Sequence, residues 1–208
     1  HGRFWDPNGV PFGRYRRMKI GQCFTITQLR YLRHHLTQQI SQIGPQLIFQ
    51  GNRSNRDTLR VWGTQGDDVV TVEGDTVSAN AATANYFGMD AVIVVGNRGN
   101  DMIRVNNSFA KHVSVFGGDG NDTLYGDDGA DSVQGGDDRD LIFGGIDDVV
   151  DGGEGGDDYD TLDLTAWGPG TTNILYDPDN PENGTVEFLD QDGNVIGTMT
   201  FSNIEAVV

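Results

Sequence analysis

A nine-residue pattern that returns in register along residues 117–163 constrains this chain more than any other feature. Three consecutive units read GGDGNDTLY (117–125), GDDGADSVQ (126–134) and GGDDRDLIF (135–143). A shortened unit, GGIDDVVD (144–151), and the insert GGE are followed by GGDDYDTLD (155–163), which restores the register. A period this short is typical of a solenoid, in which each unit buries its apolar residue only against neighbouring units.

The residue types within one unit predict its local structure. The first position is Gly in every full unit, the sixth is Asp and the eighth is Leu, Val or Ile. Glycine allows the backbone of a tight turn, so the first six residues predict a turn and the last three a short strand. The middle residue of each strand then faces the core. The predicted core residues are Leu124, Val133, Ile142, Val150 and Leu162.

Weaker copies of the pattern lie upstream, at wider spacing. GTQGDDVVT (63–71) and GNRGNDMIR (96–104) keep the first and sixth positions, and GNRSNRDTLR (51–60) is a degraded copy. Gly63 is 33 residues from Gly96, which is 21 residues from Gly117. These intervals predict larger coils of a parallel β-helix that narrows into the regular repeats.

The aspartates of the repeats would repel one another unless a cation compensates them. The chain has a net charge of −17, and residues 61–208 alone carry −25. Stacked turns rich in carboxylate and carbonyl oxygens suit Ca²⁺, which prefers six to eight oxygen ligands. Zinc is disfavoured, because cysteines and clustered histidines are absent from the repeats. The alternative is a glycine-rich solenoid whose aspartates serve only solubility.

These units resemble the RTX (repeats-in-toxin) nonapeptide G-G-x-G-x-D-x-U-x, in which U is large and apolar. The resemblance is close over 117–163, weaker over 51–104 and absent from residues 1–50. It implies a right-handed parallel β-roll in which two nonapeptides form one full turn and Ca²⁺ lies between adjacent turns. It also implies export through a type I secretion channel, with external calcium driving the folding.

The resemblance assigns the metal ligands by position in the repeat. The sixth-position carboxylates carried over are Asp122, Asp131, Asp140 and Asp160, with Asp148 from the shortened unit and Asp68 and Asp101 from the upstream copies. Residues that complete the sites, chiefly through backbone carbonyls, are Gly117, Asp119, Gly120, Gly126, Asp128, Gly129, Gly135, Asp137 and Gly144. Two departures weaken the match. Asp138 and Asp158 replace the fourth-position glycine, and Asp68 and Asp101 lack a repeat nine residues away, which predicts incomplete sites.

The N-terminal region differs in charge and in periodicity. Residues 1–60 carry a balance of +8, concentrated in RYRRMK (14–19). Apolar residues recur at three- and four-residue steps over 28–43, between Thr27 and Gly44-Pro45, and predict an amphipathic helix that caps the solenoid. The basic arm is expected to contact the acidic body, a neighbouring copy, another surface protein, or an anionic lipid or sugar surface. Nucleic acid is disfavoured as a partner, since the acidic body would repel it.

The C-terminal region predicts a second cap. TVEFLD and VIGTMTF read as strands joined by the turn QDGN, so a β-hairpin is expected over the solenoid end. This tail also resembles the segment that precedes Hint domains in some RTX proteins. The predicted divisions are a basic arm with capping helix, degenerate β-helix coils, the RTX β-roll and a C-terminal cap, at 1–47, 48–116, 117–165 and 166–208.

No catalytic motif is found in the sequence. It contains no G-x-S-x-G and no H-E-x-x-H, and its single cysteine, Cys23, has no evident partner and is read as a small buried side chain. It has no apolar run long enough to span a membrane. We therefore expect no enzymatic activity but a secreted or cell-surface structural or adhesive module. The alternatives are the non-catalytic module of a secreted hydrolase, lyase or epimerase, and a subunit of an extracellular array or virion surface.

Overall fold

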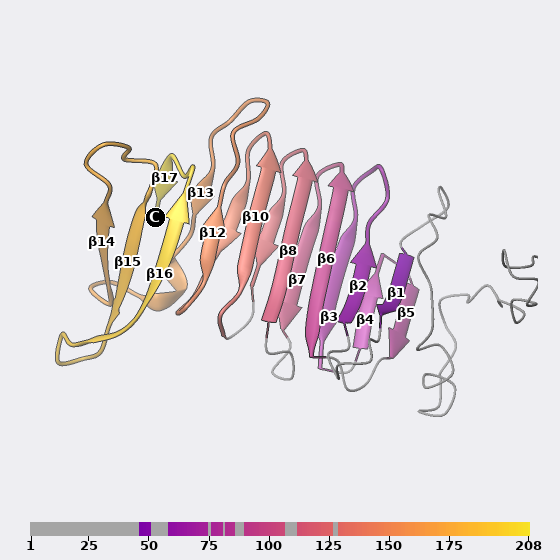
Figure 1. Cartoon of the computed structure of the whole chain (residues 1–208), viewed down its shortest axis with the longest axis horizontal. Coiled ribbons are helices and arrows are strands. Elements are labelled where there is room, and N and C mark those ends of the chain that lie inside the picture. The colour runs from indigo at the N-terminus through magenta and orange to yellow at the C-terminus, as the bar shows by residue number, and fades with distance from the viewer. Residues whose placement is uncertain are drawn as a thin grey trace, which may run out of the picture.

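The computed structural model describes residues 46–50, 58–74, 76–80, 82–85, 90–106, 112–126 and 129–208. The expected helix over 28–43 and the basic arm lie outside these residues. Within them the chain is built almost entirely of β-strands that stack along one axis (Figure 1). No helix among them is long and apolar enough to cross a membrane.

The strands form two sheets that face each other across the core. The nine-stranded sheet has the order β1-β2-β6-β8-β10-β12-β16-β15-β14. Its strands are β1 (Gln46–Gln50), β2 (Thr58–Trp62), β6 (Ala91–Arg98), β8 (His112–Asp119), β10 (Ser132–Asp137), β12 (Val149–Asp151), β14 (Thr172–Tyr176), β15 (Gly184–Leu189) and β16 (Val195–Ser202). The run from β2 to β16 is parallel throughout.

The eight-stranded sheet has the order β17-β13-β11-β9-β7-β3-β4-β5. Its strands are β3 (Val69–Glu73), β4 (Thr76–Ala79), β5 (Ala82–Asn85), β7 (Met102–Asn106), β9 (Thr123–Tyr125), β11 (Leu141–Phe143), β13 (Thr161–Leu162) and β17 (Ala206–Val207). Its run from β3 to β17 is also parallel. Because the chain alternates between the two sheets, successive strands wind into the β-roll that the repeats predicted.

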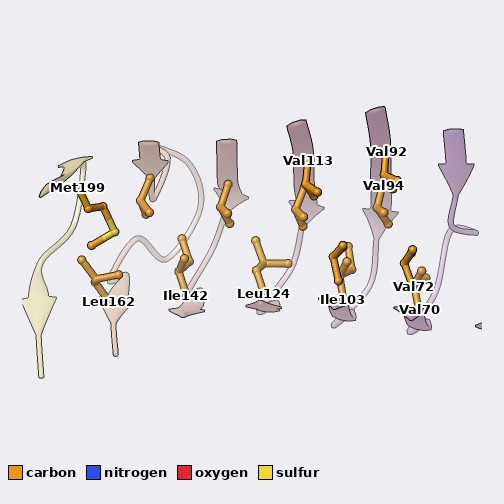
Figure 2. Packing of buried hydrophobic residues seen from close by; sticks show 14 of the residues in the cluster. Val70, Val72, Val92, Val94, Ile103, Val113, Leu124, Ile142, Leu162 and Met199 are labelled. Carbon is orange, nitrogen blue, oxygen red and sulfur yellow. The ribbon is translucent and has the colours of Figure 1, made fainter. Parts of the chain in front are cut away.

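Identical positions of successive turns stack in the core. In the nine-stranded sheet Val94, Val115, Val133 and Val150 are aligned by the register of the parallel pairs. In the opposite sheet the aligned residues are Val70, Ile103, Leu124, Ile142 and Leu162 (Figure 2). All five core residues predicted from the repeat are 0–1% exposed, which confirms the turn-and-strand interpretation of the nine-residue unit.

The wide upstream spacing has a different cause from the one expected. Residues added between Gly63 and Gly96 form β4 and β5, which pair antiparallel with β3 and with each other. They extend the edge of the eight-stranded sheet, while β2 pairs with β6, and β3 with β7, in continuous parallel register. The expectation of larger coils is therefore wrong for this interval, although the upstream strands are parallel as predicted.

The C-terminal hairpin is present and does more than cover the end. β15 and β16 pair antiparallel across the turn at Asp190–Asn194, where Gly193 has a φ of 83°. However, β16 also pairs parallel with β12, and β17 pairs parallel with β13. The C-terminal segment thus supplies the last strand of each parallel run. Both parallel runs therefore continue into the C-terminal segment, and the two sheets enclose one hydrophobic core.

Two adjacent valines on β12 test the packing. Val150 is 0% exposed and Val149 is 56% exposed. The same side chain therefore occurs on the buried face and on the exposed face of one strand. We expect Val150→Ala to lower the unfolding free energy of the calcium-loaded protein by about 2–3 kcal/mol. Val149→Ala should cost less than about 1 kcal/mol. Urea denaturation measures both, and equal losses would contradict the assignment of the core face.

Candidate metal centre

Two rows of turns connect the sheets. The first turn row leads from the nine-stranded to the eight-stranded sheet and consists of residues 63–68, 96–101, 117–122, 135–140, 152–160 and 203–205. The second turn row returns the chain and contains Asp131 and Asp148. Positive φ angles shape the first row: φ is 119° at Gly120 and 79° at Asp138, both at the fourth position. Asp138 therefore adopts the positive φ expected of the glycine that it replaces, whereas Asp158 is not among the residues with positive φ.

The sixth-position aspartates of the first turn row form one buried column. All of them are 0–3% exposed. The backbone N–H of each of the first four donates to Oδ1 of the aspartate in the next turn. The four hydrogen bonds run from Asp68 to Asp101 (2.8 Å), Asp101 to Asp122 (2.7 Å), Asp122 to Asp140 (2.8 Å) and Asp140 to Asp160 (2.7 Å). The upstream aspartates Asp68 and Asp101 thus have neighbouring turns in space, 33 and 21 residues further along the chain.

The second oxygen of most of these carboxylates has no protein partner. Oδ2 of Asp101, Asp122, Asp140 and Asp160 is buried and accepts no hydrogen bond. Asp68, at the N-terminal end of the column, differs: its Oδ2 accepts from Thr64 Oγ1 at 2.9 Å, and its Oδ1 from Asn80 Nδ2 at 2.6 Å. Buried polar atoms without a partner are costly and rare in folded proteins. Four of them in one column indicate that another group binds there.

The first-position glycines leave the space that such a group needs. A Cβ atom added at Gly117 would overlap Oδ2 of Asp122 and lie 2.6 Å from the carbonyl oxygen of Gly135. A Cβ atom added at Gly135 would likewise overlap Oδ2 of Asp140 and the carbonyl oxygen of Gly152. Each pocket therefore joins a carboxylate oxygen of one turn with a carbonyl oxygen of the next, and a side chain on the glycine would fill it.

Burial makes these carboxyls weak acids in the absence of a cation. Desolvation, followed by the charges of neighbouring carboxylates, raises the pKa of Asp101 to about 6, that of Asp122 and Asp160 to about 7, and that of Asp140 to about 8. A divalent cation reverses this effect, since it stabilises the charged form. A row of buried carboxylate and carbonyl oxygens without nitrogen or sulfur ligands fits Ca²⁺.

The second turn row brings together one pair of aspartates. Asp131 donates its backbone N–H to Oδ1 of Asp148 at 2.9 Å, and Gly145 donates to Oδ2 of Asp148 at 2.7 Å. A Cβ atom at Gly126 would lie 3.5 Å from Oδ2 of both aspartates. Burial raises the pKa of Asp148 to about 7. Asp148 therefore occupies a turn equivalent to that of Asp131, although its unit is one residue short.

The remaining predicted ligands occupy different environments. The side chains of Asp119 and Asp137 are exposed, and their carbonyls accept the N–H of Gly99 and Gly120 at 2.9 and 3.1 Å. Gly129 has a φ of 136° and lies in open space, and Asp128 is outside the described residues. A Cβ atom at Gly144 would lie 2.6 Å from Sδ of Met199. The apolar neighbour at Gly144 distinguishes it from the glycines of the first turn row.

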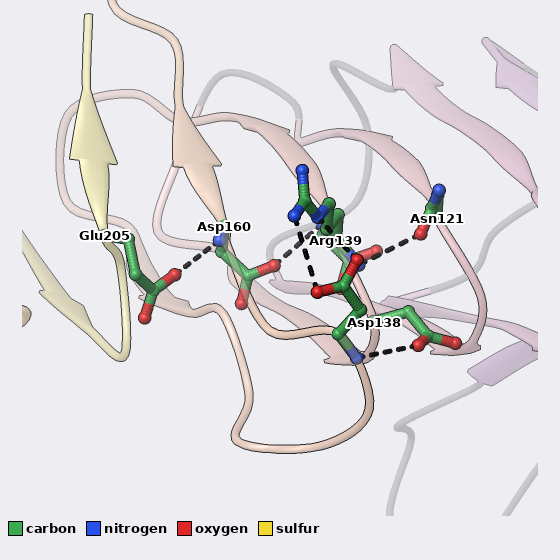
Figure 3. Close-up of polar contacts among 7 residues, drawn as sticks. Asn121, Asp138, Arg139, Asp160 and Glu205 are labelled. Atoms are coloured by element: carbon green, nitrogen blue, oxygen red, sulfur yellow. Dashed lines mark hydrogen bonds and ion pairs between the residues drawn. The ribbon is translucent and has the colours of Figure 1, made fainter.

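One acidic residue at this edge was not predicted. Glu205 lies directly before β17 and accepts the backbone N–H of Asp160 (Figure 3). The four aspartates of the column after Asp68 accept in the same way from the turn before them. Its sequence, Glu205-Ala206-Val207, has the acid-x-apolar order of the sixth to eighth repeat positions. The register confirms this equivalence, because Ala206 pairs with Thr161 and Val207 with Leu162. Glutamate in place of aspartate and the absence of preceding glycines hid the correspondence.

A paired substitution tests the glycine pockets. We expect Gly135→Ala to remove one Ca²⁺ or to weaken its binding by about tenfold or more, because the methyl group would occupy the space between two oxygens. Gly66→Ala is the matched control, since a Cβ atom there meets nothing within 4 Å. Isothermal titration calorimetry gives both quantities. Identical calcium binding by the two variants would contradict the assignment of the pockets.

Comparison with known proteins agrees with this geometry. Residues 116–148 match the family model of the RTX calcium-binding nonapeptide repeat, in 4 copies. The matched segment contains the turns of both rows from Gly117 to Asp148. A search of curated proteins gives no match to the chain.

Proposed function

Because residues 116–148 carry RTX calcium-binding nonapeptide repeats, we propose that the chain is a structural or adhesive module of an exported bacterial protein, folded by external calcium. The observation that carries this proposal is the column of four buried Oδ2 atoms without a protein partner. Such a column is unfavourable as a set of bare charges and favourable once cations lie between the turns. Calcium binding then contributes directly to the free energy of folding.

The location follows from where calcium is plentiful. Proteins with RTX repeats are typically extracellular. Sites that work outside the cell bind Ca²⁺ with dissociation constants of about 10⁻⁴–10⁻³ M, and cytosolic calcium buffers bind it at about 10⁻⁹–10⁻⁸ M. A chain tuned to the external range stays unfolded in the cytosol and passes through a type I channel in that state. It folds on emerging, and the metal sites thereby couple folding to export.

A non-catalytic role is supported by the burial of the unusual carboxyls. Carboxyls with pKa values near neutrality are typical of general acids and bases. In this chain, however, the four carboxyls of the column with raised pKa values are 0–3% exposed and lie between backbone turns. A substrate has no access to them, whereas a single ion fits. Their raised pKa values therefore follow from burial beside other carboxylates, and we assign these carboxyls no catalytic role.

A calcium titration tests the proposal. Far-UV circular dichroism is recorded on chelator-treated protein while free Ca²⁺ is raised, with Mg²⁺ at equal concentrations as the control. We expect β-sheet signal to appear with a midpoint near the extracellular range of about 10⁻⁴–10⁻³ M. Full folding at about 10⁻⁷ M or below would overturn the link to export, because the chain would then fold before leaving the cell.

A further inference from the structure

The first turn row ends in a turn unlike the others. Residues 152–160 are three longer than the six-residue turns before them, owing to the insert between the repeats. Asp158 and Asp160 are the fourth and sixth positions of the unit that follows the insert, and the last segment of the chain brings Glu205 to the same point. Ligand oxygens of Asp158, Asp160 and Glu205 all lie within 4.8 Å of one another. Among the described residues this is the one three-carboxylate group with metal-ligand spacing.

The buried member of this group has an oxygen that no protein atom satisfies. Asp160 is 0% exposed, and its Oδ1 accepts the N–H of Asp140 at 2.7 Å. Its Oδ2 has no hydrogen-bond partner. A Cβ atom at Gly152 would overlap both this Oδ2 and the carbonyl oxygen of Asn203. The glycine pocket is thus repeated here, with Asn203 supplying the carbonyl that a repeat glycine supplies elsewhere.

No cationic side chain within the described residues forms an ion pair with this group. Arg139, on the preceding turn, pairs with Asp157 at 3.1 Å and lies over the ring of Tyr159. Among the described residues, neither of the two ion pairs involves Asp158, Asp160 or Glu205. Three carboxylates at this spacing need a cation or a shared proton.

We propose that Asp158, Asp160 and Glu205, with the carbonyl of Asn203, form a terminal calcium site that fastens the C-terminal segment to the roll. The site lies outside the matched repeats, and three carboxylates replace the single carboxylate of each repeat pocket. All its ligands are oxygens, so it takes a hard cation of the Ca²⁺ class. The inference rests on the proposed calcium-driven folding and adds a site with ligands from the C-terminal cap.

The site explains how so short a strand is held. β17 has two residues and pairs with β13 through hydrogen bonds from Ala206 N to Asp160 O and from Val208 N to Leu162 O, both 3.0 Å. Glu205 precedes this strand directly, and Asp160 precedes its partner. An ion between the two carboxylates would therefore fix the register of β17 and close the C-terminal end of the eight-stranded sheet.

Terbium provides a direct probe, because Tb³⁺ occupies oxygen-rich calcium sites and its emission is sensitised by a nearby tyrosine. Tyr159 stands between Asp158 and Asp160 in the sequence. Two variants remove a ligand, Glu205→Gln and Asp158→Asn, and the second changes an exposed residue, so it retains the fold. Matched controls are Glu187→Gln on β15 and Asp157→Asn next to Asp158. Tb³⁺ emission and calcium stoichiometry from calorimetry are measured on the full chain.

We expect each ligand variant to bind one ion fewer, or to bind it about tenfold or more weakly, with loss of emission excited through Tyr159. The controls should match the unchanged protein. Unchanged stoichiometry and emission in Asp158→Asn would overturn the site, whatever Glu205→Gln does, and would leave a shared proton as the explanation. If the unchanged protein folds fully in chelator, the proposed function fails instead, and the terbium stoichiometry still decides the site.

Discussion

Chelation of calcium at pH 8 is expected to unfold the roll, with loss of the far-UV β-sheet signal and about a twofold or larger increase in the radius of gyration. The carboxyls of Asp101, Asp122 and Asp160 are mostly ionised at pH 8, because this pH lies above their pKa values of about 6, 7 and 7. Without cations the column would therefore hold adjacent buried charges, each with an oxygen that has no partner. Uncompensated buried charges cost several kcal/mol each, a total that exceeds the stability of an ordinary domain.

The expansion is measured by small-angle X-ray scattering in excess chelator, alongside circular dichroism. Calcium added back in excess should restore both signals, whereas Mg²⁺ should not, because it dehydrates reluctantly and demands a stricter octahedral geometry. Unchanged scattering and dichroism after complete calcium removal would contradict the claim that cations hold the turns together.

Without metal, acid is expected to stabilise the roll, the reverse of ordinary acid denaturation. The first-row carboxyls have pKa values raised from 3.8 to between about 6 and about 8 in the folded chain. A raised carboxyl pKa stabilises the folded state most below the unfolded value, and that contribution is lost as the pH rises through the folded value. Lowering the pH from 8 to about 5 in chelator should therefore increase the folded fraction. A shift of two pKa units on one buried carboxyl corresponds to about 3 kcal/mol.

Asp140→Asn isolates this effect. The amide oxygen can accept the N–H of Asp122, as Oδ1 does at 2.8 Å, and the amide nitrogen can donate toward the carbonyl of Gly152. We expect the metal-free variant to be more stable than the unchanged protein at pH 8 and to bind less calcium. Asp192→Asn, at an exposed residue of the turn between β15 and β16, is the control and should change neither quantity. The folded fraction in chelator at pH 5 and pH 8, from far-UV circular dichroism, measures the stability. A folded fraction that falls on acidification would refute the explanation.

The regular part of the fold could be predicted because the repeat fixes both the turn and the inward-facing residue. Leu124, Ile142 and Leu162 are buried for that reason. Between Gly63 and Gly96 the sequence shows only that residues have been added. A wider coil and an added pair of antiparallel strands satisfy the same length, and the structure has the strands β4 and β5.

The site was predictable in its aspartates but not in its two ends. The period of the repeat identifies Asp122 and Asp140 as ligands. It does not show that they lie in one column, which follows only if two nine-residue units form one turn of the roll. At the N-terminal end, Asp68 is satisfied by Thr64 and Asn80, and Asn80 comes from the added strands. At the C-terminal end, Glu205 follows no glycine-rich turn, so only the parallel pairing of β17 with β13 reveals its equivalence to the repeat aspartates.

The most direct test of the central claim is the anomalous scattering of calcium in crystals grown with the ion. The account predicts peaks in the glycine pockets of the first turn row, between Oδ2 of Asp122 and the carbonyl of Gly135 and between Oδ2 of Asp140 and the carbonyl of Gly152. Each peak should have oxygen ligands at about 2.3–2.6 Å. An intact roll with no anomalous peak in these pockets would contradict it, because the buried carboxylates would then be held without cations.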